Sequence, residues 1–275
     1  MIKIITHPGV SHFDEFLAIC LILANGFDDT EYVIERREPR YSDLQDPNTW
    51  VLDIGLKLEP EKHNFDHHQD GDSECAFVLV ADYLGLTPLL QNIPWWKAKS
   101  ALDTKGPDHV IKMMDLSIDE FLALGSPLER FMLDQFANNP NSMIDLMKSF
   151  GKKVISNAKR YNERMKYYEE KCYFVDLEVG EKWKVFINPT SDIFAINRYV
   201  EKHPESANIV AMLSHDDRGG GYMLYRFANE MLDFSILEDD PKVKFAHKNG
   251  FVLKTHCRIS MEDILELIKK AIKPL

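Results

Sequence analysis

The sequence has few cysteines, and no two of them stand at the spacing of a metal or redox motif. The four are Cys20, Cys75, Cys172 and Cys257, and none belongs to a C-x-x-C pair. Zinc-finger and thioredoxin-like sites are therefore excluded, and buried reduced thiols are the expected state. The phosphate-binding loop G-x-x-x-x-G-K-[ST] is also absent, so nucleoside-triphosphate binding of that kind is not supported.

Long apolar runs are lacking as well. The longest one, from Phe16 to Ala24, is too short to span a bilayer and directly follows two acidic residues. The first residues, Met1 to Ile5, carry no basic, apolar and small-residue regions of a signal peptide. We therefore expect a soluble protein without a membrane partner, located in the cytoplasm or, in a eukaryote, in an organelle.

Basic residues are too few to balance the acidic ones. The chain has 33 Lys and Arg against 44 Asp and Glu, which gives a formal net charge of -11. A protein that grips long duplex nucleic acid would usually be basic. Any nucleic-acid substrate should therefore be short or single-stranded, and metal ions and a local basic pocket would hold it. The simpler interpretation of the charge, which we favour, is solubility.

The length and the apolar content are those of a globular protein. With 275 residues, of which 45% are hydrophobic and 28% charged, the chain can bury a large core. It is long enough for two domains, although a single domain remains open.

Strand and helix signals alternate along the first half of the chain. We predict strands at Lys3–Thr6, Tyr32–Arg37 and Trp50–Ile54, and helices at Asp14–Asn25 and Ser73–Leu84. This alternation is typical of an α/β fold with a parallel sheet flanked by helices. Ligands of such sheets bind beyond the carboxyl ends of the strands. His7 and Asp53 both fall at predicted strand ends.

Helices dominate the middle of the chain. We predict them at Pro94–Leu102, at Ser117–Phe136 and, after the break at Asn138–Ser142, at Met143–Lys171. We interpret the last helix as a connector, so that residues 1–142 form a metal-binding catalytic domain, 143–171 the connector and 172–275 a substrate-binding domain. An ordinary surface helix of one domain remains the alternative.

The last third of the chain predicts a smaller, mixed α+β domain. Its expected strands are Tyr173–Leu177, Trp183–Ile187, Ile209–Leu213, Tyr222–Arg226, Val243–His247 and Phe251–Lys254, and its expected helices are Asp192–Glu201 and one that starts at Ser260. Gly219–Gly221 fits a hairpin turn between two of the strands, and Asn249-Gly250 favours a second tight turn.

Histidines and carboxylates gather in two short stretches. The first holds His7, His12 and Asp14 before a predicted helix, and the second holds Asp66, His67 and His68 after a polar loop. Each residue alone has an ordinary explanation, such as a helix cap for Asp14 or a turn for Asp53. Together with Asp53 they match the oxygen and nitrogen ligands of a pair of divalent ions, which commonly drive attack of water on phosphorus.

On these residues the chain resembles the DHH phosphoesterase superfamily, and within it most closely the melanocyte-proliferating-gene family of DHH-like exonucleases. Three stretches carry the resemblance, which spans most of the chain: Thr6–Glu15, then Asp53–Gly55 with Pro60–Gln69, and Phe245–Phe251 with Lys254 and Thr255. The first two are specific and the third is looser.

The resemblance implies two ions of Mn2+ or Mg2+ bound by His7, His12, Asp14, Asp53 and His67. His12 stands where many superfamily members carry Asp. A further carboxylate is expected after the Asp-His-His motif, and Asp103 is our candidate for it, with Asp108 and Asp115 as alternatives. This chain does not show the Asp-Asn-Gly segment usual at that place in the nearest family.

The expected activity is metal-dependent phosphodiester hydrolysis, resembling that of an exonuclease, on a short or single-stranded nucleic acid. Asp53 would contact both ions, and His68 would stabilise the transition state or protonate the leaving oxygen. Cations of the final part are the candidates for substrate binding across a cleft: Arg218, Arg226, His247, Lys254 and Arg258. Hydrolysis of pyrophosphate or another small phosphoanhydride, and a non-catalytic metal-binding regulatory protein, remain alternatives, and assembly into a homo-oligomer stays open.

Overall fold

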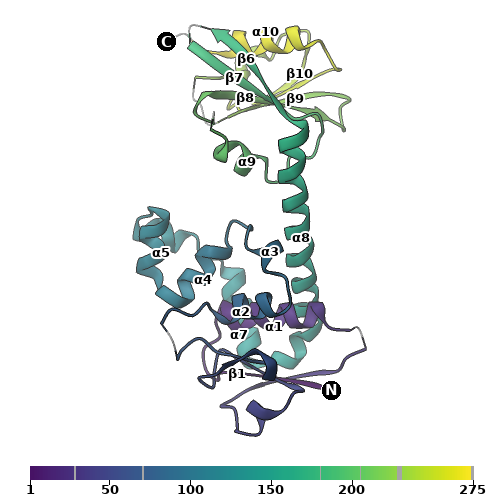
Figure 1. Ribbon diagram of the computed structural model, residues 1–275. Coiled ribbons are helices and arrows are strands. Elements are labelled where there is room, and N and C mark those ends of the chain that lie inside the picture. Colours follow the sequence, from purple (N-terminus) through teal and green to yellow (C-terminus); the bar gives the residue numbers. More distant parts are fainter. Residues whose placement is uncertain (28, 70, 180, 205, 228–230, 274–275) are drawn as a thin grey trace. The chain divides into compact units, whose positions relative to one another are not determined.

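The computed structural model describes the whole chain except residues 28, 70, 180, 205, 228–230 and 274–275. Its contacts divide the chain into two compact units, Met1–Arg160 and Tyr161–Leu275, which are described one at a time. The division falls within one long helix, α8 (Ile144–Lys171), which appears in teal in Figure 1. The domain limits expected at 142 and 172 stay a prediction.

The first unit contains a five-stranded sheet in the order β2-β1-β3-β5-β4. Its strands are β1 (Ile2–Thr6), β2 (Tyr32–Arg36), β3 (Thr49–Leu52), β4 (Leu58–Glu59) and β5 (Asn64–Phe65). The pairs of β1 with β2, of β1 with β3 and of β3 with β5 are parallel, and β4 is an antiparallel edge strand. The predicted parallel sheet is confirmed, and β1, β3 and β5 all end at one edge.

The rest of the first unit is mainly helical. Its helices are α1 (Phe13–Asn25), α2 (Ala76–Tyr83), α3 (Thr87–Leu90), α4 (Trp96–Lys105), α5 (Pro107–Met114), α6 (Ile118–Ala123), α7 (Pro127–Asn138) and the start of α8, with short 3-10 turns at Asp43–Gln45, Pro60–Lys62 and Pro140–Met143. Helix α1 lies next to α2 in Figure 1, and it is buried on nearly all sides, which explains its nearly uniform apolar sequence. Phe77, Phe136 and Met147 pack in the same core.

The helices of this unit differ from the sequence prediction at two places. The segment from Ser117 to Phe136 forms two helices, α6 and α7, because Pro127 disfavours helical backbone at Ser126, which instead caps α7. Helix α5 was not predicted, although Gly106 and Pro107 provide a start signal for it.

The second unit contains a six-stranded sheet in the order β10-β11-β9-β8-β7-β6. Its strands are β6 (Tyr173–Val179), β7 (Glu181–Ile187), β8 (Ile209–Asp216), β9 (Gly221–Arg226), β10 (Val243–Ala246) and β11 (Val252–Thr255), and its helices are α9 (Ile196–Lys202) and α10 (Met261–Ala271), with 3-10 turns at Ser206–Asn208 and Phe234–Leu237. Only β7 and β8 pair in parallel among these described strands. The predicted mixed α+β architecture is confirmed.

Alternate side chains of this second sheet enter two separate cores. Val185 and Ile187 pack with residues of α10, whereas Phe186 packs with Tyr168 of α8 and Ile196 of α9. The turn expected at Gly219–Gly221 joins the antiparallel strands β8 and β9. Within the described part of the chain, every helix is too short or too polar to cross a membrane.

Candidate metal centre

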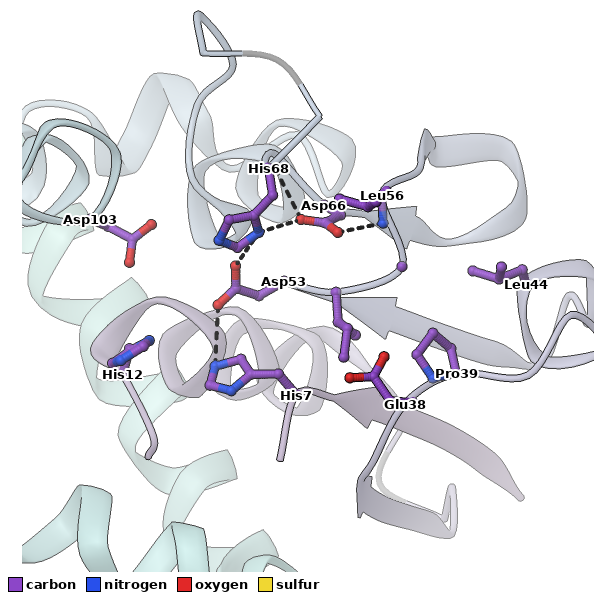
Figure 2. Close-up of a pocket in the computed structure, with 12 residues that line it drawn as sticks. His7, His12, Glu38, Pro39, Leu44, Asp53, Leu56, Asp66, His68 and Asp103 are labelled. Carbon is purple, nitrogen blue, oxygen red and sulfur yellow. Dashed lines mark hydrogen bonds and ion pairs between the residues drawn. The ribbon is translucent and has the colours of Figure 1, made fainter. Parts of the chain in front are cut away.

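The candidate site lies where neighbouring parallel strands of the first unit end. His7 follows β1, Asp53 follows β3, and Asp66, His67 and His68 follow β5. The pairs Thr6–Leu52 and Leu52–Phe65 set these three strand ends side by side. Figure 2 shows His7 and His68 approaching Asp53 from opposite sides. The chain thus brings two distant motifs together because each one leaves the same edge of the sheet.

Asp53 occupies the middle of the site, and each of its two carboxylate oxygens has a different neighbour. Oδ1 lies 3.2 Å from Nε2 of His67, and Oδ2 lies 3.5 Å from Nε2 of His7. Asp53 is almost fully buried and has a left-handed backbone with φ of 57°, which is uncommon outside glycine. The turn directly after β3 therefore aims one carboxylate at two separate groups of ligands.

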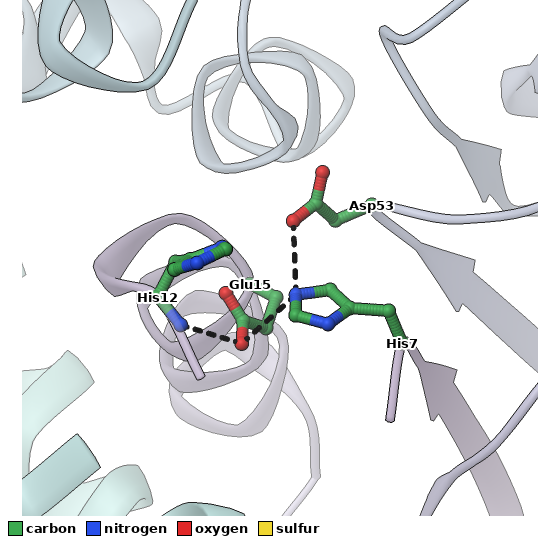
Figure 3. A group of neighbouring side chains, drawn as sticks. All are labelled: His7, His12, Glu15 and Asp53. Carbon is green, nitrogen blue, oxygen red and sulfur yellow. Dashed lines mark hydrogen bonds and ion pairs between the residues drawn. The ribbon is translucent and has the colours of Figure 1, made fainter. Parts of the chain in front are cut away.

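The first group consists of His7, His12, Glu15 and Asp53, whose ligand atoms all lie within 4.8 Å of one another. Nδ1 of His7 lies 3.0 Å from the carbonyl oxygen of Pro8, which places the ring hydrogen on Nδ1. Nε2 then faces Asp53 and Glu15, as Figure 3 shows, and it can bind an ion once it has released its proton. This is the tautomer that a histidine ligand needs.

The second group consists of Asp14, His67 and Asp103. Nε2 of His67 lies 3.1 Å from Oδ2 of Asp103 and 3.8 Å from Oδ2 of Asp14. Asp14 also accepts hydrogen bonds of 2.9 and 2.7 Å from the backbone N–H groups of Ala76 and Phe77, at the amino end of α2. These bonds fix its carboxylate between two helices.

Asp103 reaches this second group from α4. The other two sequence candidates, Asp108 and Asp115, are exposed at the two ends of α5 and belong to none of the ligand groups found among the described residues. Of the three aspartates considered for that role, the structure brings only Asp103 to the site.

His67 and His68 point in different directions. The side chain of His67 is 9% exposed, whereas that of His68 is 55% exposed. Oδ1 of Asp66 lies 2.7 Å from Nδ1 of His68 and also accepts from its backbone N–H, while Oδ2 accepts from the N–H of Leu56. Asp66 therefore orients His68 and leaves Nε2 of that ring free for a bound molecule.

A pocket of about 640 Å³ opens beside these groups. His7, His12, Asp53, Asp66, His68 and Asp103 contribute to one part of it, and Glu38, Pro39, Leu44, Ile54, Gly55 and Leu56 extend it away from the ligands (Figure 2). No lysine or arginine of the described chain lines it. The pocket thus combines an acidic, histidine-rich end with a largely apolar wall.

Burial and proximity shift the pKa values of the site. The carboxylates of Asp53 and Glu15, which lie 3.5 and 3.3 Å from Nε2, raise the pKa of His7 to about 10. Burial lowers the pKa of His67, but the nearby carboxylates of Asp103 and Asp53 outweigh it and raise that pKa to about 10. Burial raises the pKa of Asp53, but the nearby rings of His67 and His7 outweigh it and lower that pKa to about 2. The cluster therefore favours positive charge between its carboxylates.

The donor set fits hard divalent cations. Several buried ligand atoms have no hydrogen-bond partner in the described structure: Nε2 of His7, Nε2 of His67, Oδ1 of Asp53 and Oε2 of Glu15. The separations of 3.1 to 3.5 Å between facing ligand atoms resemble the distance of about 3 Å between adjacent ligands of an octahedral ion. Buried unpaired atoms are costly, and bound cations would satisfy them.

Two residues of the site had no role in the sequence interpretation, Glu15 and Arg36. Glu15 is fully buried and accepts a hydrogen bond of 2.8 Å from the N–H of His12. The His-x-x-Glu spacing before a helix is a capping-box signal that could have singled it out. Arg36, at the end of β2, donates to the carbonyl oxygens of His7 and Val10. Nothing in the local sequence of Arg36 indicated this contact.

The five cations expected to bind substrate do not form one cluster within the second unit. Arg218 lies in the β8–β9 turn, Lys254 pairs with Asp216 at 3.2 Å, and Arg258 lies 3.2 Å from Nδ1 of His215, all toward one end of the sheet. Arg226 and His247 lie toward the other end, as the pairing of β9 with β8 and of β10 with β11 shows. At most three of the five share a surface region.

Comparison with known proteins gives a match to one family model, over the amino-terminal part of the chain that contains both histidine-rich stretches. No curated protein and no solved structure matches the chain. The matching segment contains β1, α1, β3 and β5, and with them His7, His12, Asp14, Asp53 and His67. Residues 3–76 match the model of MYG1_exonuc, which is described as an uncharacterised protein family (UPF0160).

Proposed function

We propose that the protein is a two-metal phosphoesterase of the DHH type. The main support for this proposal is the position of Asp53, whose two carboxylate oxygens face two different groups of histidine and carboxylate ligands. The family match over residues 3–76 supports a metal-dependent hydrolase. The first ion would be held by His7, His12 and Asp53, and the second by Asp14, Asp53, His67 and Asp103.

Divalent ions bound there, as Mn2+ or Mg2+, would polarise a phosphate and lower the pKa of a water molecule. The chain itself contributes His68. Oδ1 of Asp66 accepts the hydrogen on Nδ1 of that ring, so the protonated ring can use Nε2 to donate a hydrogen bond to the transition state or a proton to the leaving oxygen. The exposed position of His68 on the pocket supports contact with substrate over a role as ligand.

The pocket supports a substrate with one phosphate at the ions and an uncharged remainder beside it. Its extension is lined by apolar residues and by Glu38, and by no lysine or arginine of the described chain. A second phosphate group there would lack a counter-charge. We therefore propose phosphodiester cleavage in a short or single-stranded nucleic acid, and rank pyrophosphate hydrolysis second.

Substrate binding by the second unit is a separate proposal. Arg218, Lys254 and Arg258 share one end of its sheet and are candidates for contacts with phosphates. Their combined replacement by alanine in the full chain should raise KM and leave Mn2+ affinity unchanged. An unchanged KM would remove these residues from substrate binding.

The test uses the full-length protein with Mn2+ or Mg2+ on dinucleotides, short single-stranded RNA and DNA, and pyrophosphate. We expect hydrolysis of a nucleic-acid substrate that stops on chelation. Asp53→Ala should lose both metal and turnover, whereas Asp115→Ala, an exposed aspartate outside the site, should keep both. Full activity of Asp53→Ala, or metal binding without turnover on any substrate, would contradict the proposal.

A further inference from the structure

Glu15 lies inside the first ligand group, although its position in the sequence marks it as a helix-capping residue. We propose that Glu15 is a direct ligand of the first ion, so that two histidines and two carboxylates hold this ion. The proposal rests on the two-metal function above and adds a residue to it. Glu15 is placed between His7 and His12 in the first turn of α1 (Figure 3).

The two oxygens of Glu15 have different surroundings. Oε1 accepts the hydrogen bond from the N–H of His12 and lies 3.3 Å from Nε2 of His7. Oε2 is buried and has no hydrogen-bond partner in the described structure, and the residue is 0% exposed. Burying a charged oxygen without a partner is costly. A cation bound by His7, His12 and Asp53 would remove that cost.

Helix capping alone does not account for this burial. The chain contains a second capping box, at Ser117 and Glu120 of α6, where the glutamate accepts from the N–H of Ser117 at 2.8 Å. That glutamate lies on the surface, where water solvates its charge. Because capping works with an exposed carboxylate, the full burial of Glu15 among histidines calls for another role.

Arg36 does not provide the missing partner either. Its NH2 group lies 3.6 Å from Oε1 of Glu15, which is the oxygen that already has a partner. The guanidinium donates to the backbone of His7 and Val10 and stacks 4.9 Å from the ring centre of Phe136. Arg36 therefore holds the loop that carries His7, and it leaves Oε2 of Glu15 unpaired.

The charge of the site supports the same assignment. Without Glu15 the first ion would contact a single carboxylate, that of Asp53, which it shares with the second ion. With Glu15 the two groups contain four carboxylates, namely Asp14, Glu15, Asp53 and Asp103. The four negative charges of these carboxylates neutralise the four positive charges of two divalent cations. A buried site requires such a charge balance.

The experiment compares Glu15→Gln with Glu120→Gln in the full-length protein. Glutamine keeps the acceptor for the capping hydrogen bond and nearly the same volume, and it removes the charge at both capping boxes alike. Calorimetric titration with Mn2+ should show two ions in the wild type and in Glu120→Gln. In Glu15→Gln the affinity for one ion should fall by about 100-fold or more, since loss of outer-sphere partners alone costs about 10–100-fold.

Thermal melting separates loss of a ligand from loss of structure. Without metal, Glu15→Gln should still unfold in one cooperative transition, at a melting temperature below that of the wild type, because the ion pair between Glu15 and His7 is lost. With Mn2+, its gain in melting temperature should be smaller than that of the wild type. Should Glu15→Gln fail to fold, Glu15→Asp keeps the charge but shortens the side chain, and weakened binding of one ion is expected there too.

The outcomes distinguish this inference from the function on which it rests. A wild type that binds no Mn2+ would overturn the two-metal proposal itself. Two ions bound with equal affinity by the wild type and by both variants of Glu15 would overturn only the role of Glu15 as a ligand and leave it as a cap. Weaker binding of one ion alone, in a variant whose metal-free form still unfolds cooperatively, would support it.

Discussion

Binding of divalent ions to the metal-free protein should depend steeply on pH. Nearby carboxylates raise the pKa values of His7 and His67 to about 10 each. Below that pH both rings are protonated in the metal-free protein, and each must release its proton before Nε2 can bind an ion. Raising the pH therefore tightens binding, and lowering it releases the ions.

The expected slope follows from this exchange. Where one proton is lost for each ion bound, the affinity rises about ten-fold per pH unit below the pKa of the histidine. From about pH 6.5 to about pH 8.5, the dissociation constant for each ion should then fall by about 100-fold. A histidine with an ordinary pKa near 6.5 would give only about a two-fold change over the same interval.

Titration calorimetry with Mn2+ measures this directly. Repeating the titration in two buffers of different ionisation enthalpy counts the protons released, and we expect one for each ion at about pH 7.5. His7→Gln should release one proton fewer than the wild type. A two-fold change of affinity across the interval, or no proton release, would refute the assignment of raised pKa values to these two rings.

Other predictions concern single residues and stability. His68→Ala should retain Mn2+ and lower kcat by about 100-fold or more, the scale of acid–base groups, and metal loss in this variant would instead make His68 a ligand. In a Mn2+ titration, Asp103→Asn should lower the affinity for one of the two ions, whereas Asp108→Asn should not. Equal affinities in the two variants would exclude Asp103 as a ligand. Gly151→Ala would place a Cβ 2.0 Å from a carbonyl oxygen of α1 and should cost about 1–3 kcal/mol in denaturant unfolding, whereas Gly71→Ala, with open space around it, should change stability by less than about 0.5. The raised histidine pKa values stabilise the metal-free fold fully below about pH 6.5, so its melting temperature should fall as the pH rises toward about 10, and a flat profile would contradict this.

Much of the first unit could be predicted from the sequence, because its strands are short apolar runs that end in polar residues. His7 and Asp53 follow β1 and β3, and parallel pairing alone is enough to bring them to one edge. Asp103 was harder, since it lies inside a helix and no local pattern marks it. It reaches His67 only through the packing of α4, which is a tertiary effect.

The surroundings of Glu15 and the positions of the cations in the second unit could not be predicted from the sequence pattern. The spacing of Glu15 from His12 indicates a cap, and only the fold reveals that the same carboxylate is buried beside His7. The cations of the last third looked equivalent as charges. In the sheet, Lys254 is paired with a buried aspartate near the start of β9, whereas Arg226 lies at the other end of the same strand.

Helix α8 belongs to the cores of both units. Met147 and Ala158 are buried in the core of the first unit, and Tyr168 is fully buried in a core of the second. A truncation at Phe150 would strip Ala158 from the first core, so loss of activity would report unfolding as readily as loss of substrate contacts. Constructing independent halves therefore requires each half to carry its own share of this helix, up to Arg160 for the first unit and from Tyr161 for the second.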